Sequence, residues 1–140
     1  MNAPHDIPER EAFVDCSGKR RVFSLECHQV PTGWAVMATE VTDTDFGYRF
    51  DGFSPSNPYL ALGQVRGKIR AGLATRYLSA SEPEPTPSHD ILRGHIDWDR
   101  STASPVLVVD GRPLTMFDLT RILGSHEGWR VELRIVDPTE

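Results

Sequence analysis

The chain has 140 residues, of which 39% are hydrophobic and 25% charged, a balance typical of a soluble globular protein large enough to bury a core. It contains no apolar run as long as the roughly 20 residues of a membrane helix and no basic-then-apolar secretory signal at its start, and its two cysteines do not make a disulfide framework. Together with a net charge of -5, which disfavours general affinity for nucleic acid, these features lead us to expect a cytoplasmic protein without a membrane partner.

The first half of the chain predicts four β-strands, because apolar and polar residues alternate between turn signals. Ser17-Gly18 and Pro31-Thr32-Gly33 are two of these turns. Glycines in the fourth strand indicate a bulge or a close approach of another backbone. The predicted strands span residues 12–16, 21–28, 34–41 and 46–53.

A helix is predicted over residues 58–79. Asn57 suits the N-cap and Pro58 the first helical position. Apolar residues recur at helical spacing, so one face of the helix should lie on the sheet. These residues are Leu62, Val65, Ile69, Leu73 and Tyr77. Three glycines in the helix each cost about 1 kcal/mol relative to alanine, which predicts close packing of the helix backbone there.

A proline-rich stretch, residues 80–90, predicts a semi-extended linker. It divides the chain into a first lobe of strands and a helix, residues 11–79, and a smaller α+β lobe, residues 91–140, with a flexible tail over residues 1–10. A lobe of about 50 residues rarely stands alone, so we expect it to pack on the first lobe or on another copy of the chain.

The smaller lobe predicts strands, a hairpin turn and a short helix. Residues 94–99 read as a strand with Ile96 and Trp98 facing inward. Asp110-Gly111 is favoured in a tight hairpin, and Thr115 is placed to cap a helix with Asp118 as the capping-box acid.

The chain then predicts a final half-buried strand over residues 129–135, after a helix end at Gly128. Its inward residues are Trp129, Val131, Leu133 and Ile135. The fold class is therefore α+β: an antiparallel sheet with one long helix packed on a face, plus a smaller β-hairpin–helix–strand lobe.

Residues 58–79 carry four basic side chains and no acidic one, which indicates a candidate nucleic-acid-binding face. The basic residues are Arg66, Lys68, Arg70 and Arg76. Strands followed by a helix bearing Gly67-Lys-Ile-Arg70 are loosely similar to a double-stranded-RNA-binding domain or a HicB-type antitoxin, a resemblance that implies phosphate contact. The alternative is a solvated face, or pairing with acids elsewhere in the protein.

His95, Asp97 and Asp99 fall on one face of a strand, and imidazole with carboxylates can hold a divalent metal. The alternative is the polar face of an edge strand. Cys16, Cys27 and His28 lack a fourth ligand at zinc spacing, so the cysteines read as small buried apolar residues.

The block Val109-Asp-Gly-Arg-Pro-Leu-Thr, with Glu127-Gly-Trp before the final strand, resembles the end of a bacterial family of uncharacterised proteins that share a DGR turn and an EGW or EGF entry. The resemblance covers about the last 35 residues and implies no activity.

No nucleotide-binding or hydrolase motif is present in the sequence. We therefore expect a non-catalytic cytoplasmic protein-interaction or regulatory module without a cofactor, whose partner is another protein or a second copy of the chain. A nucleic-acid-binding module and a metal-dependent enzyme are the two alternatives.

Overall fold

The protein is described by a computed structural model that covers residues 4, 6–79, 87 and 91–140. The chain forms two compact units. The first comprises Met1–Asp43, Arg49–Thr75 and Val136–Glu140, and the second comprises Thr44–Tyr48 and Arg76–Ile135. The predicted linker, residues 80–90, lies outside the described residues except for Pro87, which forms an isolated bridge with Leu78.

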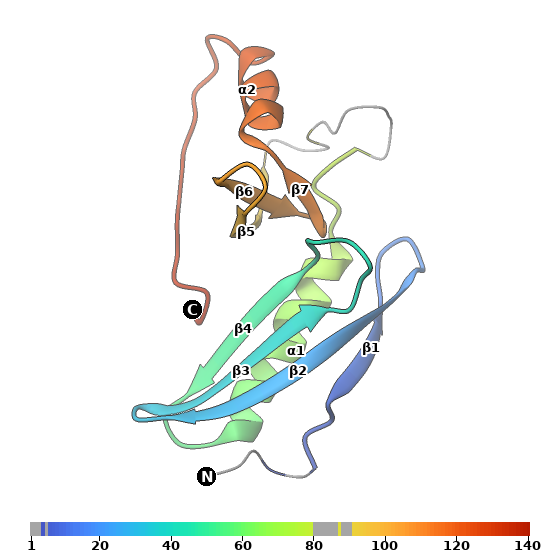
Figure 1. Ribbon diagram of the computed structural model, residues 1–140, viewed down its shortest axis with the longest axis vertical. Helices are drawn as coiled ribbons and strands as arrows, with labels where there is room; N and C mark the ends of the chain where they lie inside the picture. The colour runs from blue at the N-terminus through green and yellow to red at the C-terminus, as the bar shows by residue number, and fades with distance from the viewer. Residues whose placement is uncertain (1–3, 5, 80–86, 88–90) are drawn as a thin grey trace. The chain divides into compact units, whose positions relative to one another are not determined.

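The first unit is a four-stranded antiparallel sheet with one long helix on one face (Figure 1). The strands are β1 (Arg10–Val14), β2 (Arg20–Val30), β3 (Gly33–Glu40) and β4 (Arg49–Ser54), in the order β1-β2-β3-β4. The helix is α1 (Pro58–Ala74). All four predicted strands are present, although β4 begins at Arg49 rather than at residue 46.

Alternation along the strands builds the core of this unit. Phe23 and Val36 point from the sheet toward α1, where Val65 and Ile69 are equally buried. Full burial of a side chain of this size contributes about 1.5–3 kcal/mol. Of the predicted helical stripe, only Tyr77 is outside the buried face of α1, because the helix has ended before it.

Helix α1 begins where the sequence predicts and ends five residues earlier than residue 79. Asn57 caps it, since its side chain accepts a hydrogen bond of 2.7 Å from the Tyr59 amide. After Ala74 the backbone becomes extended, and the amides of Tyr77 and Leu78 donate to the carboxylate of Asp110 at 2.7–3.1 Å. These side-chain hydrogen bonds replace the helical ones and account for the early end.

The prediction of close backbone packing holds at two glycines. A Cβ atom at Gly52 of β4 would lie 2.6 Å from the Ala61 carbonyl oxygen, so this strand passes directly against α1. A Cβ atom at Gly72 would meet the Phe50 ring. Gly63 and Gly67 face open space, and close packing was the wrong explanation for them.

The second unit is a three-stranded antiparallel sheet with a short helix. Its strands are β5 (Gly94–Asp99), β6 (Ser104–Val109) and β7 (Arg112–Leu114), in the order β5-β6-β7, followed by α2 (Met116–Gly124). Asp110 and Gly111 both have positive φ, 55° and 74°, as in the tight turn predicted for this dipeptide. The capping box is also confirmed: Thr115 and Asp118 exchange hydrogen bonds of 3.0 and 3.1 Å.

The core of the second unit lies between α2, β6 and β7. Leu114 and Ile122 are buried there with Val109 and Leu78. The cluster extends through partly buried Tyr77, Leu92, Leu107 and Leu119. The α+β class and the packing of helices on sheets are thereby confirmed.

Two predictions for this unit were wrong. Ile96 and Trp98 are not buried. Ile96 pairs with Leu107, which packs on the core, and so shares its face of the sheet, but α2 packs on β6 and β7 and the side chains of Ile96 and Trp98 are 61% and 55% exposed. Residues 129–135 form no strand, because no described strand supplies hydrogen bonds along them. The alternation is present in the sequence, but residues 129–135 form no hydrogen-bonded ladder with any described strand.

Candidate interaction site

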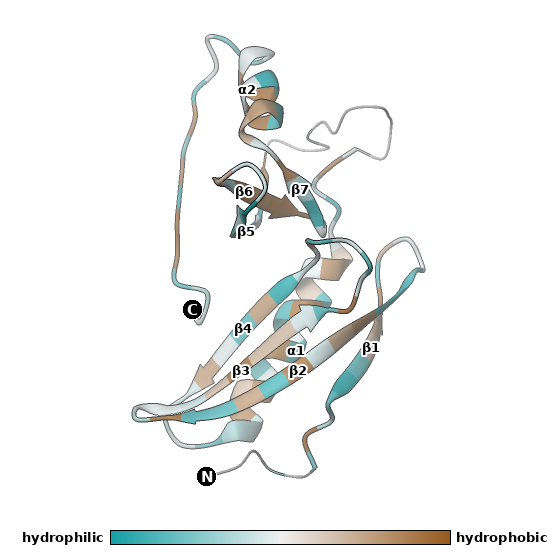
Figure 2. Cartoon of the chain, viewed as in Figure 1, coloured by the Kyte–Doolittle hydropathy of each residue, from teal (hydrophilic) through white to brown (hydrophobic). Residues whose placement is uncertain are grey.

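Residues 129–135, hereafter the C-terminal segment, run extended from the turn after α2 (Figures 1 and 2). Gly128, with a φ of 89°, ends the turn. Trp129 is fixed there by a 2.9 Å hydrogen bond from its amide to the His126 carbonyl and by an edge-to-face contact between the two rings. The beginning of the segment is therefore held in place by the fold.

The apolar side chains of the C-terminal segment are exposed to solvent. Trp129, Val131 and Ile135 are 69–74% exposed, and Leu133 is 85% exposed. Arg130, Glu132 and Arg134 lie between them and are also exposed. Contiguous exposed apolar side chains in a soluble protein mark surfaces that bind other molecules, and an extended unpaired backbone is a ready template for strand pairing.

Strand β5 is the matching feature on the sheet of this unit. It pairs with β6 on one side only among the described strands, so its other edge has no described partner strand. At Trp98 the backbone amide donates a 2.8 Å hydrogen bond to the Asp97 carboxylate instead. Ile96 and Trp98 are exposed on one face of β5. On the other face, the Nε2 atom of His95 lies 3.6 Å from a carboxylate oxygen of Asp97.

The predicted metal ligands are only partly brought together. His95 and Asp97 are neighbours, but the Asp99 carboxylate accepts hydrogen bonds of 2.9 and 2.7 Å from the amide and hydroxyl of Ser101. Within the described ranges, no three His, Cys, Asp or Glu side chains are grouped to hold a metal ion. The geometry here is that of a polar strand face and the turn that follows it.

Three of the four predicted phosphate-binding residues lie on α1, and each of these three contacts the rest of the first unit. Arg66 forms a 2.9 Å ion pair with Glu11, and Arg70 lies over the Phe13 ring at 5.5 Å. Lys68 donates to backbone carbonyls, and Arg76 follows the end of α1. Intramolecular contacts thus engage three of the four cations.

Lys68 connects α1 to the last residues of the chain. Its Nζ atom donates hydrogen bonds of 2.7 Å to the carbonyl oxygens of Asp51 and Pro138. Burial lowers the pKa of the Lys68 ammonium group, and the charges of Asp51 and Asp137 act in the opposite direction. The contact fixes the chain just beyond the C-terminal segment.

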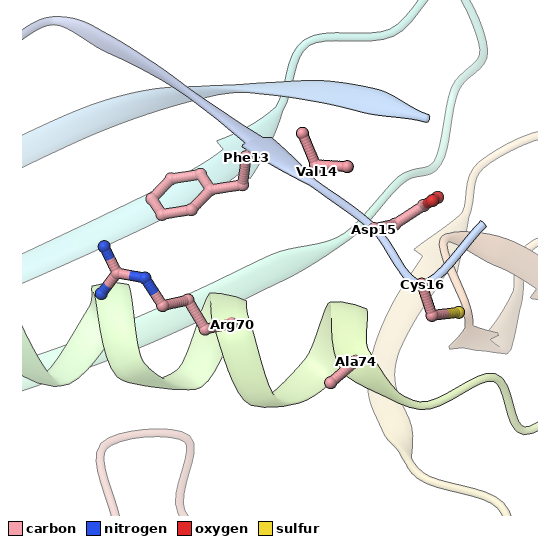
Figure 3. A pocket seen from close by; sticks show the side chains of 6 residues that line it. All are labelled: Phe13, Val14, Asp15, Cys16, Arg70 and Ala74. Carbon is pink, nitrogen blue, oxygen red and sulfur yellow. The ribbon is translucent and has the colours of Figure 1, made fainter. Parts of the chain in front are cut away.

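A shallow hollow of about 470 Å³ in the first unit is lined by residues of β1, the loop after it and α1 (Figure 3). Figure 3 shows the Phe13 ring turned toward Arg70. The lining residues are Phe13, Val14, Asp15, Cys16, Arg70 and Ala74. The polar groups of the hollow are used by the fold, which leaves no convergent set of reactive atoms there.

The carboxylate of Asp15 is a polar group of this hollow whose hydrogen bonds are made within the fold. Its carboxylate accepts hydrogen bonds from the amide and hydroxyl of Ser17 and from the Arg21 guanidinium, at 2.6–2.9 Å. Burial would raise the pKa of Asp15, but the hydrogen bonds from Ser17 and Arg21 outweigh it and hold that pKa well below its usual range. Arg21 also pairs with Glu40 at 2.8 Å, so this network ties β1, β2 and β3 together.

Sequence reasoning missed the Asp15–Arg21–Glu40 network. The spacing of Asp15 and Ser17 in a turn with glycine was a signal for a carboxylate that binds the turn amides. The pairing with Arg21 and Glu40 depends on strand register and had no local signal.

The cysteines show no reactive geometry. Burial raises the pKa of the Cys27 thiol, which disfavours the nucleophilic thiolate. Cys27 and His28 project to opposite faces of β2, and Cys16 is an exposed free thiol. Among the described residues, no helix is both long and apolar enough to cross a membrane.

Fold and surface together define a two-unit α+β protein that exposes an extended segment with alternating apolar side chains. The chain belongs to the family described as Domain of unknown function (DUF7686), whose model matches residues 5–74. Residues 77–140 match a second family model, Domain of unknown function (DUF7713). No curated protein and no solved structure matches the chain.

Proposed function

We propose that this protein is a non-catalytic, cytoplasmic protein-interaction module whose binding element is the C-terminal segment. The single observation that supports this proposal most strongly is the exposure of its four alternate apolar side chains on an extended backbone. Such a segment loses its exposed apolar surface, and gains backbone hydrogen bonds, when it joins the edge of a sheet in another protein molecule.

The chemistry of the segment favours a protein edge over other ligands. Valine, isoleucine, leucine and tryptophan at every second position suit a pleated surface. Arg130, Glu132 and Arg134 alternate in charge, which suits neither a polyanion nor a long apolar acyl layer. The charges instead provide register-specific pairs across two strands.

A site-specific photo-cross-linker at position 133, introduced in the cell of origin, tests the proposal. We expect an adduct to a protein, because the Leu133 side chain is the most exposed of the four. The matched control carries the same cross-linker at position 43, in an exposed loop of the first unit, and should give no such adduct. Absence of any position-133 adduct refutes the proposed function.

A further inference from the structure

The C-terminal segment and the outer edge of β5 each lack a neighbouring strand among the described residues. The segment has strand-like alternation without a partner strand, and β5 has an edge without a neighbour among the described strands. Each also exposes apolar side chains on one face, with Ile96 and Trp98 on β5 matching those of the segment. Pairing the two would extend the sheet and bring the two apolar sets into contact as cross-strand neighbours.

Within one chain the segment does not pair with β5. Its backbone joins no described strand, and its four apolar side chains are 69–85% exposed. A second copy of the chain can therefore supply the edge that the segment lacks.

Charge complementarity favours β5 as the recipient. If the apolar faces are aligned, the charged residues of the segment fall on the same face as His95 and Asp97. In a parallel arrangement, one register places Glu132 opposite His95 and Arg134 opposite Asp97. In an antiparallel arrangement, one register again places Glu132 opposite His95, with Arg130 opposite Asp97. Both orientations thus offer a register in which opposite charges face each other.

We infer that two copies of the chain exchange C-terminal segments, each adding residues 129–135 as a strand along the β5 edge of the other. This inference rests on the proposed function and names its partner. The exchange is reciprocal, so it closes as a two-fold dimer and leaves no further segment free to recruit a third copy. In each protomer, Ile96 and Trp98 then contact the apolar side chains of the added strand as cross-strand neighbours.

Sedimentation velocity of the full chain at tens of micromolar gives the first test. We expect the mass of two chains for the wild type and of one chain for Leu133→Asp, whose 85% exposed side chain makes folding insensitive to the change. Circular dichroism checks that the variant remains folded. Val14→Asp is the matched control, because it places an acid at another exposed apolar position, in β1, and should leave the dimer intact.

A charge exchange tests the recipient edge. Asp97→Lys should weaken the dimer about tenfold, because each dimer contains two affected cross-strand pairs that become repulsive. Adding Arg130→Asp or Arg134→Asp should restore the affinity, the former if the strands are antiparallel and the latter if they are parallel. Asp43→Lys makes the same change in charge in the first unit and should have no effect.

A single-chain mass for the wild type overturns the inference, and so does a dimer that neither arginine change restores. These failures are distinguishable from failure of the proposed function. If the cross-linker at position 133 captures a different protein while the chain sediments as a monomer, the interaction module stands and its self-exchange does not.

Discussion

The two sheets of this chain differ in how completely they are covered and closed. In the first unit, the 17 residues of α1 lie along a four-stranded sheet, and the residues that face the helix, such as Phe23 and Val36, are buried. In the second unit, the nine residues of α2 cover β6 and β7 but leave Ile96 and Trp98 of β5 in solvent. A helix rises about 1.5 Å per residue, so α2 is roughly half as long as α1.

The difference shows that the same strand pattern has two outcomes. Alternation in β2 leads to a buried face because a helix and neighbouring strands are available inside the chain. Alternation over residues 129–135 leads to exposed apolar side chains because none of the described helices and strands packs along them. Our account assigns the missing neighbour to another molecule.

The largest expected effect is on the free energy of unfolding, for one phenylalanine in the core of the first unit compared with one leucine of the C-terminal segment. Phe23→Ala should lower the free energy of unfolding by about 3–5 kcal/mol, because its side chain is fully buried. Leu133→Ala should leave the free energy of unfolding of the monomer within about 0.5 kcal/mol of wild type. Urea denaturation at low protein concentration measures both. Equal losses for the two variants would mean that the segment packs inside its own chain.

The next effect concerns the contact between β4 and α1. Gly52→Ala should cost about 1–3 kcal/mol, because the new methyl group would meet the Ala61 carbonyl oxygen and one of the two must move. Denaturant midpoints of the variant and wild type give the difference. A variant as stable as wild type would show that strand and helix are not in close contact at this position.

The pH dependence of unfolding tests the network that joins the first three strands. The folded-state pKa of Asp15 is lowered, so its contribution to stability is complete above about pH 5 and is lost as the pH falls through and below the unfolded value of about 4. Asp15→Asn should remove up to about 1.4 kcal/mol per pH unit from the acid slope of the unfolding free energy. An unchanged slope would contradict the role of this carboxylate in the network.

The smallest expected effect is an increase in stability rather than a loss. Gly63→Ala and Gly67→Ala should each raise the free energy of unfolding by about 0.5–1 kcal/mol, because both sites are helical and face open space. Thermal denaturation of these two variants, compared with that of Gly52→Ala, measures the difference in stability. Destabilisation at either position would reveal a neighbour of α1 that a single chain lacks.

Local signals in the sequence predicted the elements whose causes are themselves local. Asn57 and Pro58 define the start of α1, Asp110-Gly111 defines the hairpin, and Thr115 with Asp118 defines the start of α2. The end of α1 could not be predicted, because it depends on Asp110, which binds amides more than 30 positions earlier in the chain.

The candidate interaction site could not be predicted from the sequence for the same reason. An alternating stretch such as residues 129–135 predicts a strand, but the pattern contains no information about which molecule supplies the neighbouring strand. Ile96 and Trp98 were predicted to face inward from the alternation alone, but whether they are covered depends on the length and placement of α2. Tertiary neighbours therefore determine what the sequence pattern leaves open.

Hydrogen exchange of the backbone amides of residues 130–135, followed across a dilution series, tests the central claim most directly. Our account predicts that these amides and those of β5 become protected together at high protein concentration and lose protection together on dilution. Exchange at the unprotected rate at every concentration would contradict it, as would protection that persists unchanged at the highest dilution.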